Sequence, residues 1–226
     1  GAMVGAGSIW RLPFKAGQHG GGVFLILYIL LILVISVPGL MAENLIGRYT
    51  QKGVIGAFRE IFDRPSLQGL GIVVFLVNIA LMSYYLPILG WALYYLVHSF
   101  LFTFMQPGFQ PQAFWGAFIS SPVLTLGTHT ITALAVAGVL SLGIKDGIER
   151  VVKYLIPLLV LSLIAIAIRG ITLSGGVAGL AFAFSPNWEY LSHAETWIAA
   201  LGQALYATGL GWGVALTFGS YLRKYD

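Results

Sequence analysis

The segment that decides the fold reads Gly1-Ala-Met-Val-Gly-Ala-Gly-Ser-Ile-Trp-Arg-Leu-Pro13, an apolar stretch that is poor at forming a helix. Glycine in a helix interior costs about 1 kcal/mol and proline about 3 kcal/mol, so a break is predicted here. In a membrane, the backbone N–H and C=O groups that a break frees must face protein, water or a ligand. Freed carbonyls can hold a cation, and freed amides can hold a carboxylate. The alternative interpretation is close helix packing through small residues.

The same anomaly recurs near the other end of the chain, in Gly202-Gln-Ala-Leu-Tyr-Ala-Thr-Gly-Leu-Gly-Trp-Gly213. Its glycines again interrupt an otherwise apolar helical pattern. Two interrupted helices in one membrane protein indicate a transporter with a binding site near the middle of the membrane.

The composition is that of a protein that crosses the membrane several times. Of 226 residues, 58% are apolar and 9% are charged, with a net charge of +4 and a mean hydropathy of +0.87. Too few polar residues are present to coat a soluble globule, and disorder is excluded by the same figures. A nucleic-acid-binding role is disfavoured because the small basic excess forms no run or stripe. Without cysteine there is no disulfide, thiolate metal site or cysteine nucleophile.

The chain is expected to be an all-α membrane bundle in a single domain, residues 1–226. Residues 65–144 carry no Asp, Glu, Lys or Arg, which is more than one crossing needs. Prolines and glutamines in residues 106–112 predict a loop over about 105–124. The solidly apolar run Val23–Val34 lacks the alternation of a β-barrel. The predicted helices span about 1–16, 22–46, 66–104, 125–144, 150–170 and 195–220.

The distribution of basic residues predicts the orientation in the membrane. Lysine and arginine gather in residues 47–65, in 143–153 and after residue 222, whereas 105–124 and 171–194 hold none. We therefore expect the plasma membrane as the location, helix 1 running outward, and a cytoplasmic C-terminus of this segment. Because the chain starts inside an apolar helix and stops just after another, we expect a fragment of a longer protein.

Several segments together form a specific set of motifs. They are Val4-Gly-Ala-Gly-Ser with Trp10-Arg-Leu-Pro-Phe14, Gly20-Gly-Gly-Val-Phe24, Pro38 with Glu43 and Gly47-Arg48, Ser83-Tyr-Tyr with Gly90-Trp91, and Trp197–Gln203 with Gly211 and Ser220–Lys224. This set resembles the signatures of the neurotransmitter:sodium symporter family, in its bacterial and archaeal amino-acid transporter form. The resemblance covers essentially the whole chain. It implies two inverted repeats of five helices with helices 1 and 6 unwound, of which this chain holds helix 1 to helix 6.

The resemblance also implies a substrate site. The amides of Ala6 and Gly7 and the hydroxyl of Tyr85 would hold a carboxylate, and the carbonyls of Met3, Tyr206 and Ala207 an ammonium group. Leu81, Tyr85, Tyr206, Gly209 and Trp212 would line the side-chain pocket. Gly5 stands where amine-specific members carry an aspartate, which favours a ligand that brings its own carboxylate. A neutral, hydrophobic or aromatic amino acid is the expected substrate.

Gating and support roles follow from the same resemblance. Tyr206 would cover the site from outside, and Arg11 matches the outer-gate arginine. Glu43 matches a helix 2 glutamate that accepts hydrogen bonds from the unwound part of helix 6. An intramembrane glutamate is costly and needs such partners. From the residues alone, Glu43 could equally be a helix-end side chain that reaches the cytoplasmic interface beside Gly47-Arg48.

The ion sites depart from the family pattern. The carbonyls of Gly1 and Val4 match the second sodium site. The first site would use Met3, Ser8 and Ala207, but Ser8 replaces the usual asparagine and Ala207 lacks the usual hydroxyl. A hard cation wants about six oxygen ligands, so we expect the first site to be weak or absent, leaving one sodium ion. Tyr28 and Gln203 match two chloride positions, although Ala207 removes a hydroxyl donor there as well.

The predicted function is a sodium-coupled symporter of neutral amino acids that works by alternating access, with the lipid bilayer and missing C-terminal helices as its other partners. Coupling to protons or to a single sodium ion is an open alternative, as is a non-transporting sensor of amino acids. A channel is disfavoured because no filter motif is present. An enzyme is not expected, since no metal cluster and no second intramembrane acid accompany Glu43.

Overall fold

The computed structural model describes residues 5 and 7–223. They fold into helices, and the only β feature of these residues is an isolated bridge between Gly21 and Pro186. The chain divides into two compact units, one made of residues 1–77 with 158–226 and the other of residues 78–157. The all-α, polytopic fold class expected from the sequence is confirmed.

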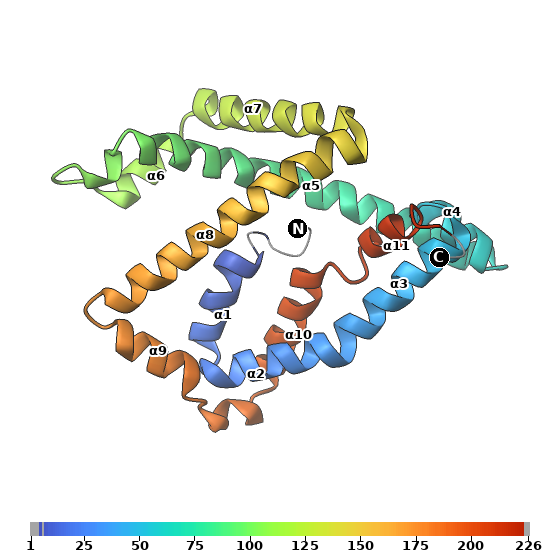
Figure 1. The fold of residues 1–226 in the computed structure, drawn as a ribbon, viewed down its shortest axis with the longest axis horizontal. Helices are drawn as coiled ribbons and strands as arrows, with labels where there is room; N and C mark the ends of the chain where they lie inside the picture. Colours follow the sequence, from blue (N-terminus) through green and yellow to red (C-terminus); the bar gives the residue numbers. More distant parts are fainter. Residues whose placement is uncertain (1–4, 6, 224–226) are drawn as a thin grey trace. The chain divides into compact units, whose positions relative to one another are not determined.

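The first unit begins with a short, irregular helix 1 and a long helix 2. The elements are the π-helical turn η1 (Gly7–Arg11), α1 (Leu12–Gln18), α2 (Gly22–Leu31), the π-helical turn η2 (Ile32–Ser36) and α3 (Val37–Thr50). In Figure 1, α2, η2 and α3 follow one another as one continuous rod. The wider η2 turn lets Pro38 enter this rod within the first turn of α3, where its missing N–H is tolerated.

The rest of the first unit joins segments from both halves of the chain. It holds α4 (Val54–Ile61), the first part of α5 (Pro65–Phe100), the last part of α8 (Arg150–Thr172), α9 (Gly176–Phe184), the 3-10 turn η5 (Trp188–Ser192), α10 (Ala194–Thr208) and α11 (Val214–Gly219). Helix 6 is therefore two pieces, α10 and α11, separated by residues 209–213.

The core of this unit lies between α2 and α10. Val23, Phe24 and Leu27 of α2 are buried against Ala200 and Ala204 of α10. The two alanines lie four residues apart on one face of α10, and their small side chains let the helices approach closely. Such small-residue faces are the usual way in which helices associate within a membrane. The first piece of helix 6, α10, is thereby packed on the first part of helix 2.

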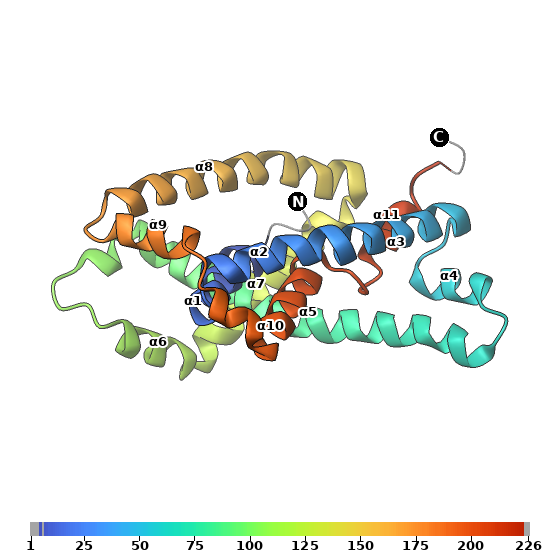
Figure 2. The ribbon, with the colours of Figure 1, turned by 90° about the horizontal axis from the view of Figure 1, so that it is seen from below.

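The second piece of helix 6, α11, packs on the other end of helix 2. Figures 1 and 2 both show α11 alongside α3. A Cβ atom added to Gly47 would overlap the carbonyl oxygen of Leu216, and one added to Gly219 would overlap that of Asn44. The two backbones touch here because neither helix carries a side chain at the crossing.

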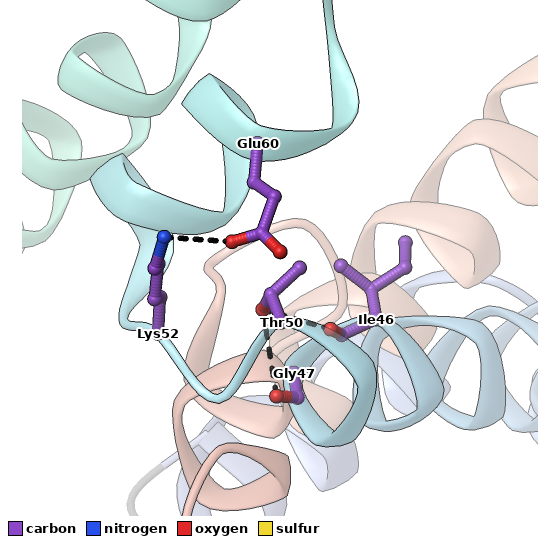
Figure 3. Close-up of polar contacts among 5 residues, drawn as sticks. All are labelled: Ile46, Gly47, Thr50, Lys52 and Glu60. Carbon is purple, nitrogen blue, oxygen red and sulfur yellow. Dashed lines mark hydrogen bonds and ion pairs between the residues drawn. The ribbon is translucent and has the colours of Figure 1, made fainter.

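After α3 the chain turns sharply into α4. Thr50, the last residue of α3, donates its hydroxyl to the carbonyl of Ile46 at 2.9 Å, and the left-handed backbone of Gln51 then ends the helix. Beyond the turn, Lys52 Nζ lies 2.8 Å from Glu60 Oε2 on α4, an ion pair at the surface that Figure 3 shows beside Thr50. Exposed ion pairs of this kind contribute little stability. The packing of the fully buried Ala57 is the stronger tie within this region.

The second unit is held by aromatic rings. It contains the remainder of α5, the 3-10 turn η3 (Thr103–Met105), α6 (Pro111–Ile119), α7 (Pro122–Ser141), the π-helical turn η4 (Ile144–Glu149) and the start of α8. Phe118 of α6 is fully buried and stacks on Tyr94 of α5 with 4.1 Å between ring centroids. Residues 105–124, expected as a loop, thus include the nine-residue helix α6, which starts at Pro111 and is stabilised by this stacking.

Four continuous helices of the described residues are long and apolar enough to cross a membrane. They are Gly22–Thr50, Pro65–Phe100, Pro122–Ser141 and Ile144–Thr172. The segments expected at 1–16 and 195–220 are not among them. The described part of helix 1 is divided between η1 and α1. Helix 6 is divided into pieces of 15 and six residues.

Gly47→Ala should destabilise the protein, because the new methyl group would meet backbone atoms that cannot move away. Overpacking of this kind typically costs about 1–3 kcal/mol. The apparent melting temperature of the purified protein in detergent should fall by roughly 2–4 °C for each kcal/mol lost. Gly69→Ala is the matched control, since nothing lies within 4 Å of its added Cβ, and it should leave the melting temperature unchanged or higher. Equal effects of the two substitutions would contradict the close crossing.

Candidate functional site

The break in helix 6 is built from three glycines. α10 ends at Thr208, and Gly209, Gly211 and Gly213 have φ angles of +69°, +87° and +70° before α11 begins. Side-chain-bearing residues rarely adopt this left-handed backbone, whereas glycine does so without steric cost. Within this segment the Gly209 amide still donates to the carbonyl of Leu205 at 2.9 Å and the Trp212 amide to that of Gly209 at 3.2 Å, so the break changes the helical pattern at its glycines and sends the Gly211 amide to a partner outside helix 6.

Helix 1 faces this break at a glycine of its own. Gly7 is buried in η1, and a Cβ atom at this position would overlap the ring of Tyr206. The amides of Ser8 and Ile9 both point to the carbonyl of Gly5, at 3.0 and 3.1 Å. Glycine at position 7 therefore allows the aromatic side chain of helix 6 to lie directly on the helix 1 backbone.

A buried amide side chain ties the two interrupted helices together. Gln203 of α10 is fully buried, and its Nε2 donates to the carbonyl of Gly7 at 2.9 Å. The other atom of this amide, Oε1, has no hydrogen-bond partner among the described residues. An unpaired buried acceptor is costly, so this oxygen is a candidate ligand for a donor that reaches the site.

Tyr206 lies between a cation and a second aromatic ring. The guanidinium carbon of Arg11 is 4.8 Å from the centroid of the tyrosine ring, a cation–π geometry. Within the break, Trp212 meets the same ring edge-on at 5.6 Å between centroids. Arg11 and Tyr206, the two residues predicted to form a gate, are thus in direct contact.

Glu43 is the anionic partner of the break. Its Oε1 accepts from the amide of Gly211 at 2.7 Å, across 168 positions of sequence. Its Oε2 has no hydrogen-bond partner in the described part of the chain. The carboxylate sits near the N-terminal end of α11, where the helix dipole favours negative charge. In this structure the side chain points to helix 6, so the alternative of a free helix-end residue does not describe it.

The structure therefore brings together Gly7, Arg11, Glu43, Gln203, Tyr206 and Trp212. Ser8 lies in η1, Ala207 in the last turn of α10, and Gly209 at its end. Tyr28 is partly buried against the α2–α10 core. Leu81 and Tyr85 lie on α5 in the second unit, and their contribution to the site stays a prediction. The predicted ligands Gly1, Met3, Val4 and Ala6 lie outside the described residues.

Two residues that the sequence did not single out as site residues also hold helix 6. Arg48 Nε donates to the carbonyl of Arg223 at 2.9 Å, and Gln51 Nε2 donates to that of Leu222 at 2.7 Å. The partners are 175 and 171 positions away in the sequence, so no local pattern signals these contacts. Among the described residues, no group of three or more His, Asp or Glu side chains could hold a metal ion.

The family-level comparison covers most of the chain. Residues 1–107 and 122–226 match the sodium:neurotransmitter symporter family. The unmatched stretch between them contains α6, so this helix lies where the chain differs from the family pattern.

Individual relatives point the same way. A sodium-dependent transporter of Haemophilus influenzae is 34% identical over 100% of this chain and 52% of its own length. The sodium-dependent transporter YhdH of Bacillus subtilis is 32% identical over 99% of this chain and 50% of its own length. The sodium-dependent neutral amino acid transporter B(0)AT2 of Bos taurus is 30% identical over 99% of this chain and 34% of its own length. The chain spans about half the length of the first two relatives.

The family predicted from the motifs is confirmed by these matches. Its members are sodium-dependent transporters and not enzymes, which agrees with the interrupted helices found here. This chain belongs to the sodium:neurotransmitter symporter family.

Proposed function

We propose that the full-length protein containing this chain is a sodium-coupled symporter of neutral amino acids with hydrophobic or aromatic side chains. The observation that carries the proposal is the pair of interrupted helices joined by the Gln203–Gly7 hydrogen bond. Such a pair offers unpaired backbone amides and carbonyls at one place, as a zwitterion requires. Relatives named as neutral amino acid transporters, in Bos taurus and Mus musculus, support this substrate class.

In the proposed mechanism each end of the substrate meets backbone groups of opposite polarity. The amides of Ala6 and Gly7 with the Tyr85 hydroxyl receive the carboxylate, and carbonyls of Met3, Tyr206 and Ala207 receive the ammonium group. Gly5 leaves this region without a protein carboxylate, so the substrate has to supply its own. The rings of Tyr206 and Trp212 supply an apolar wall, with Leu81 and Gly209 completing it.

Alternating access follows from the contacts of Tyr206. Its ring contacts both Arg11 of helix 1 and Trp212 of the break, so we propose that moving Tyr206 together with Arg11 opens the site outward. On the other side of the break, α11, the piece of helix 6 nearer the cytoplasm in the proposed orientation, would move instead. In the proposed orientation Arg11 faces the outside, and residues 222–223 face the cytoplasm of a cell whose plasma membrane holds the protein.

The coupling stoichiometry we propose is one sodium ion. The carbonyls of Gly1 and Val4 contribute to the second sodium site, which is kept. At the first sodium site Ala207 offers no hydroxyl, and Ser8 has a shorter side chain than the usual asparagine. A chloride role is disfavoured by the same alanine. Moreover, Gln203 Nε2 already donates one of its two N–H groups to Gly7. Apart from the Tyr28 hydroxyl, this leaves a single N–H donor for a chloride ion.

The full-length protein in proteoliposomes should accumulate labelled neutral amino acids under an inward sodium gradient and not when potassium replaces sodium. The Hill coefficient for sodium should be near one, because only one complete cation site remains. A coefficient near two would contradict the weakened first site. Accumulation without sodium would indicate proton coupling, and binding without accumulation would favour the sensor alternative.

Glu43→Ala should lower the initial rate of uptake by roughly 10- to 100-fold, since the Gly211 amide loses a charge-assisted partner of about 1.5–3 kcal/mol. Glu43→Gln keeps a carbonyl acceptor and should retain more activity. Uptake would be measured per molecule of protein recovered in the liposomes. Glu60→Ala is the control, because Glu60 pairs with Lys52 at the surface and does not take part in the break. Full uptake by Glu43→Ala would contradict the role of this carboxylate.

A further inference from the structure

The second piece of helix 6, α11, cannot hold its position alone. α11 has only six residues, and isolated helices shorter than about 12–15 residues are marginal in water. The carbonyls of Leu216, Phe218 and Gly219 at its end accept from the amides of residues 220–222, and the side chains of α3 reach the carbonyls of Leu222 and Arg223 just beyond. The location of α11, and of the break directly before it, therefore depends on the surface on which it packs.

That surface is α3, which contacts α11 along the length of α11. Glu43 accepts from Gly211 before α11 begins. Gly47 lies against Leu216 in its middle. Arg48 and Gln51 donate to the backbone just beyond its end. The anionic side chain is at the N-terminal end and the cationic one at the C-terminal end, which is the arrangement that the helix dipole favours.

The backbone of Gln51 gives independent evidence that its side chain has a purpose. Gln51 is the C-cap of α3, with a φ angle of 53°. A left-handed backbone costs roughly 1–2 kcal/mol for a residue with a side chain, and glycine is the usual occupant of this position. The amide of Gln51 offsets this cost by donating both to Arg48 O at 2.8 Å and to Leu222 O.

We infer that Arg48 and Gln51 are positioning residues that fix the end of helix 6 to helix 2 and thereby set the location of the break at residues 209–213. They touch neither substrate nor ion; they act through α11. Lys52 lies four residues after Arg48, beyond the end of α3, and its ammonium pairs with Glu60 on α4. Positive charge alone at this end of α3 is consequently not what holds α11.

A cysteine at position 216 would report the docking of α11 directly. Leu216 is 3% exposed, and this chain has no cysteine. Leu216→Cys would be made in the full-length protein, with any cysteine elsewhere in that protein replaced by serine. The rate of alkylation by a membrane-permeable maleimide would then be measured in proteoliposomes.

Arg48→Ala and Gln51→Gly should each raise the alkylation rate about 2- to 10-fold, the effect of losing one net hydrogen bond. Gln51→Gly removes the side-chain amide, and glycine adopts the left-handed backbone at position 51 without strain. A higher alkylation rate therefore cannot be ascribed to backbone strain. Arg48→Lys retains a donor and should fall between Arg48→Ala and the parent. Lys52→Ala is the matched control and should not change the rate. Rates equal to the parent in both Arg48→Ala and Gln51→Gly would overturn the inference.

The effect on the break would be measured by uptake, and this part rests on the proposed function. Arg48→Ala and Gln51→Gly should raise KM for the transported amino acid by a factor similar to the alkylation effect, because fewer molecules have the break in place. Lys52→Ala should leave KM unchanged. A faster alkylation with an unchanged KM would overturn the link to the site. If the parent transports no amino acid, the proposed function fails, while the alkylation series still tests the docking of α11.

Discussion

The constraint on which this structure depends is that backbone polar groups freed inside a membrane protein must find partners. Gly209, Gly211 and Gly213 interrupt helix 6 with left-handed backbone, and the Gly211 amide pairs outside the helix. Glu43 meets one of them through the Gly211 amide, and Gln203 meets the corresponding irregular stretch of helix 1 through the Gly7 carbonyl. A buried polar atom that the protein leaves unpaired, such as Gln203 Oε1, is a candidate partner for a ligand.

Helix 2 serves as the scaffold on which the interrupted helices are assembled. Its first part packs Phe24 and Leu27 against the alanine face of α10, and its last part packs Gly47 against α11. The π-helical turn η2 lies between the two parts. Helix 2 thus supports both α10 and α11. Because both pieces are packed on it, the position of the glycine segment between them is fixed.

Membership of the sodium:neurotransmitter symporter family explains the general arrangement, while individual residues distinguish this chain. Ser8 stands where the family motif usually has asparagine, Ala207 where it usually has a hydroxyl-bearing residue, and Gly5 where amine-specific members carry aspartate. Tyr206 and Trp212 give the break an aromatic lining.

The sequence by itself determined the membrane class, the family and both interruptions, because these depend on local properties: apolar length, and glycine and proline within it. It also identified Glu43, Arg11 and Tyr206 through motifs. It did not indicate the helix α6, whose formation depends on Phe118 stacking on Tyr94 of another helix. Nor did it decide between the two environments open to Glu43, or reveal Arg48 and Gln51. Only the tertiary structure decided these, since each partner is a backbone group more than 160 positions away and every residue offers the same backbone groups to a distant side chain.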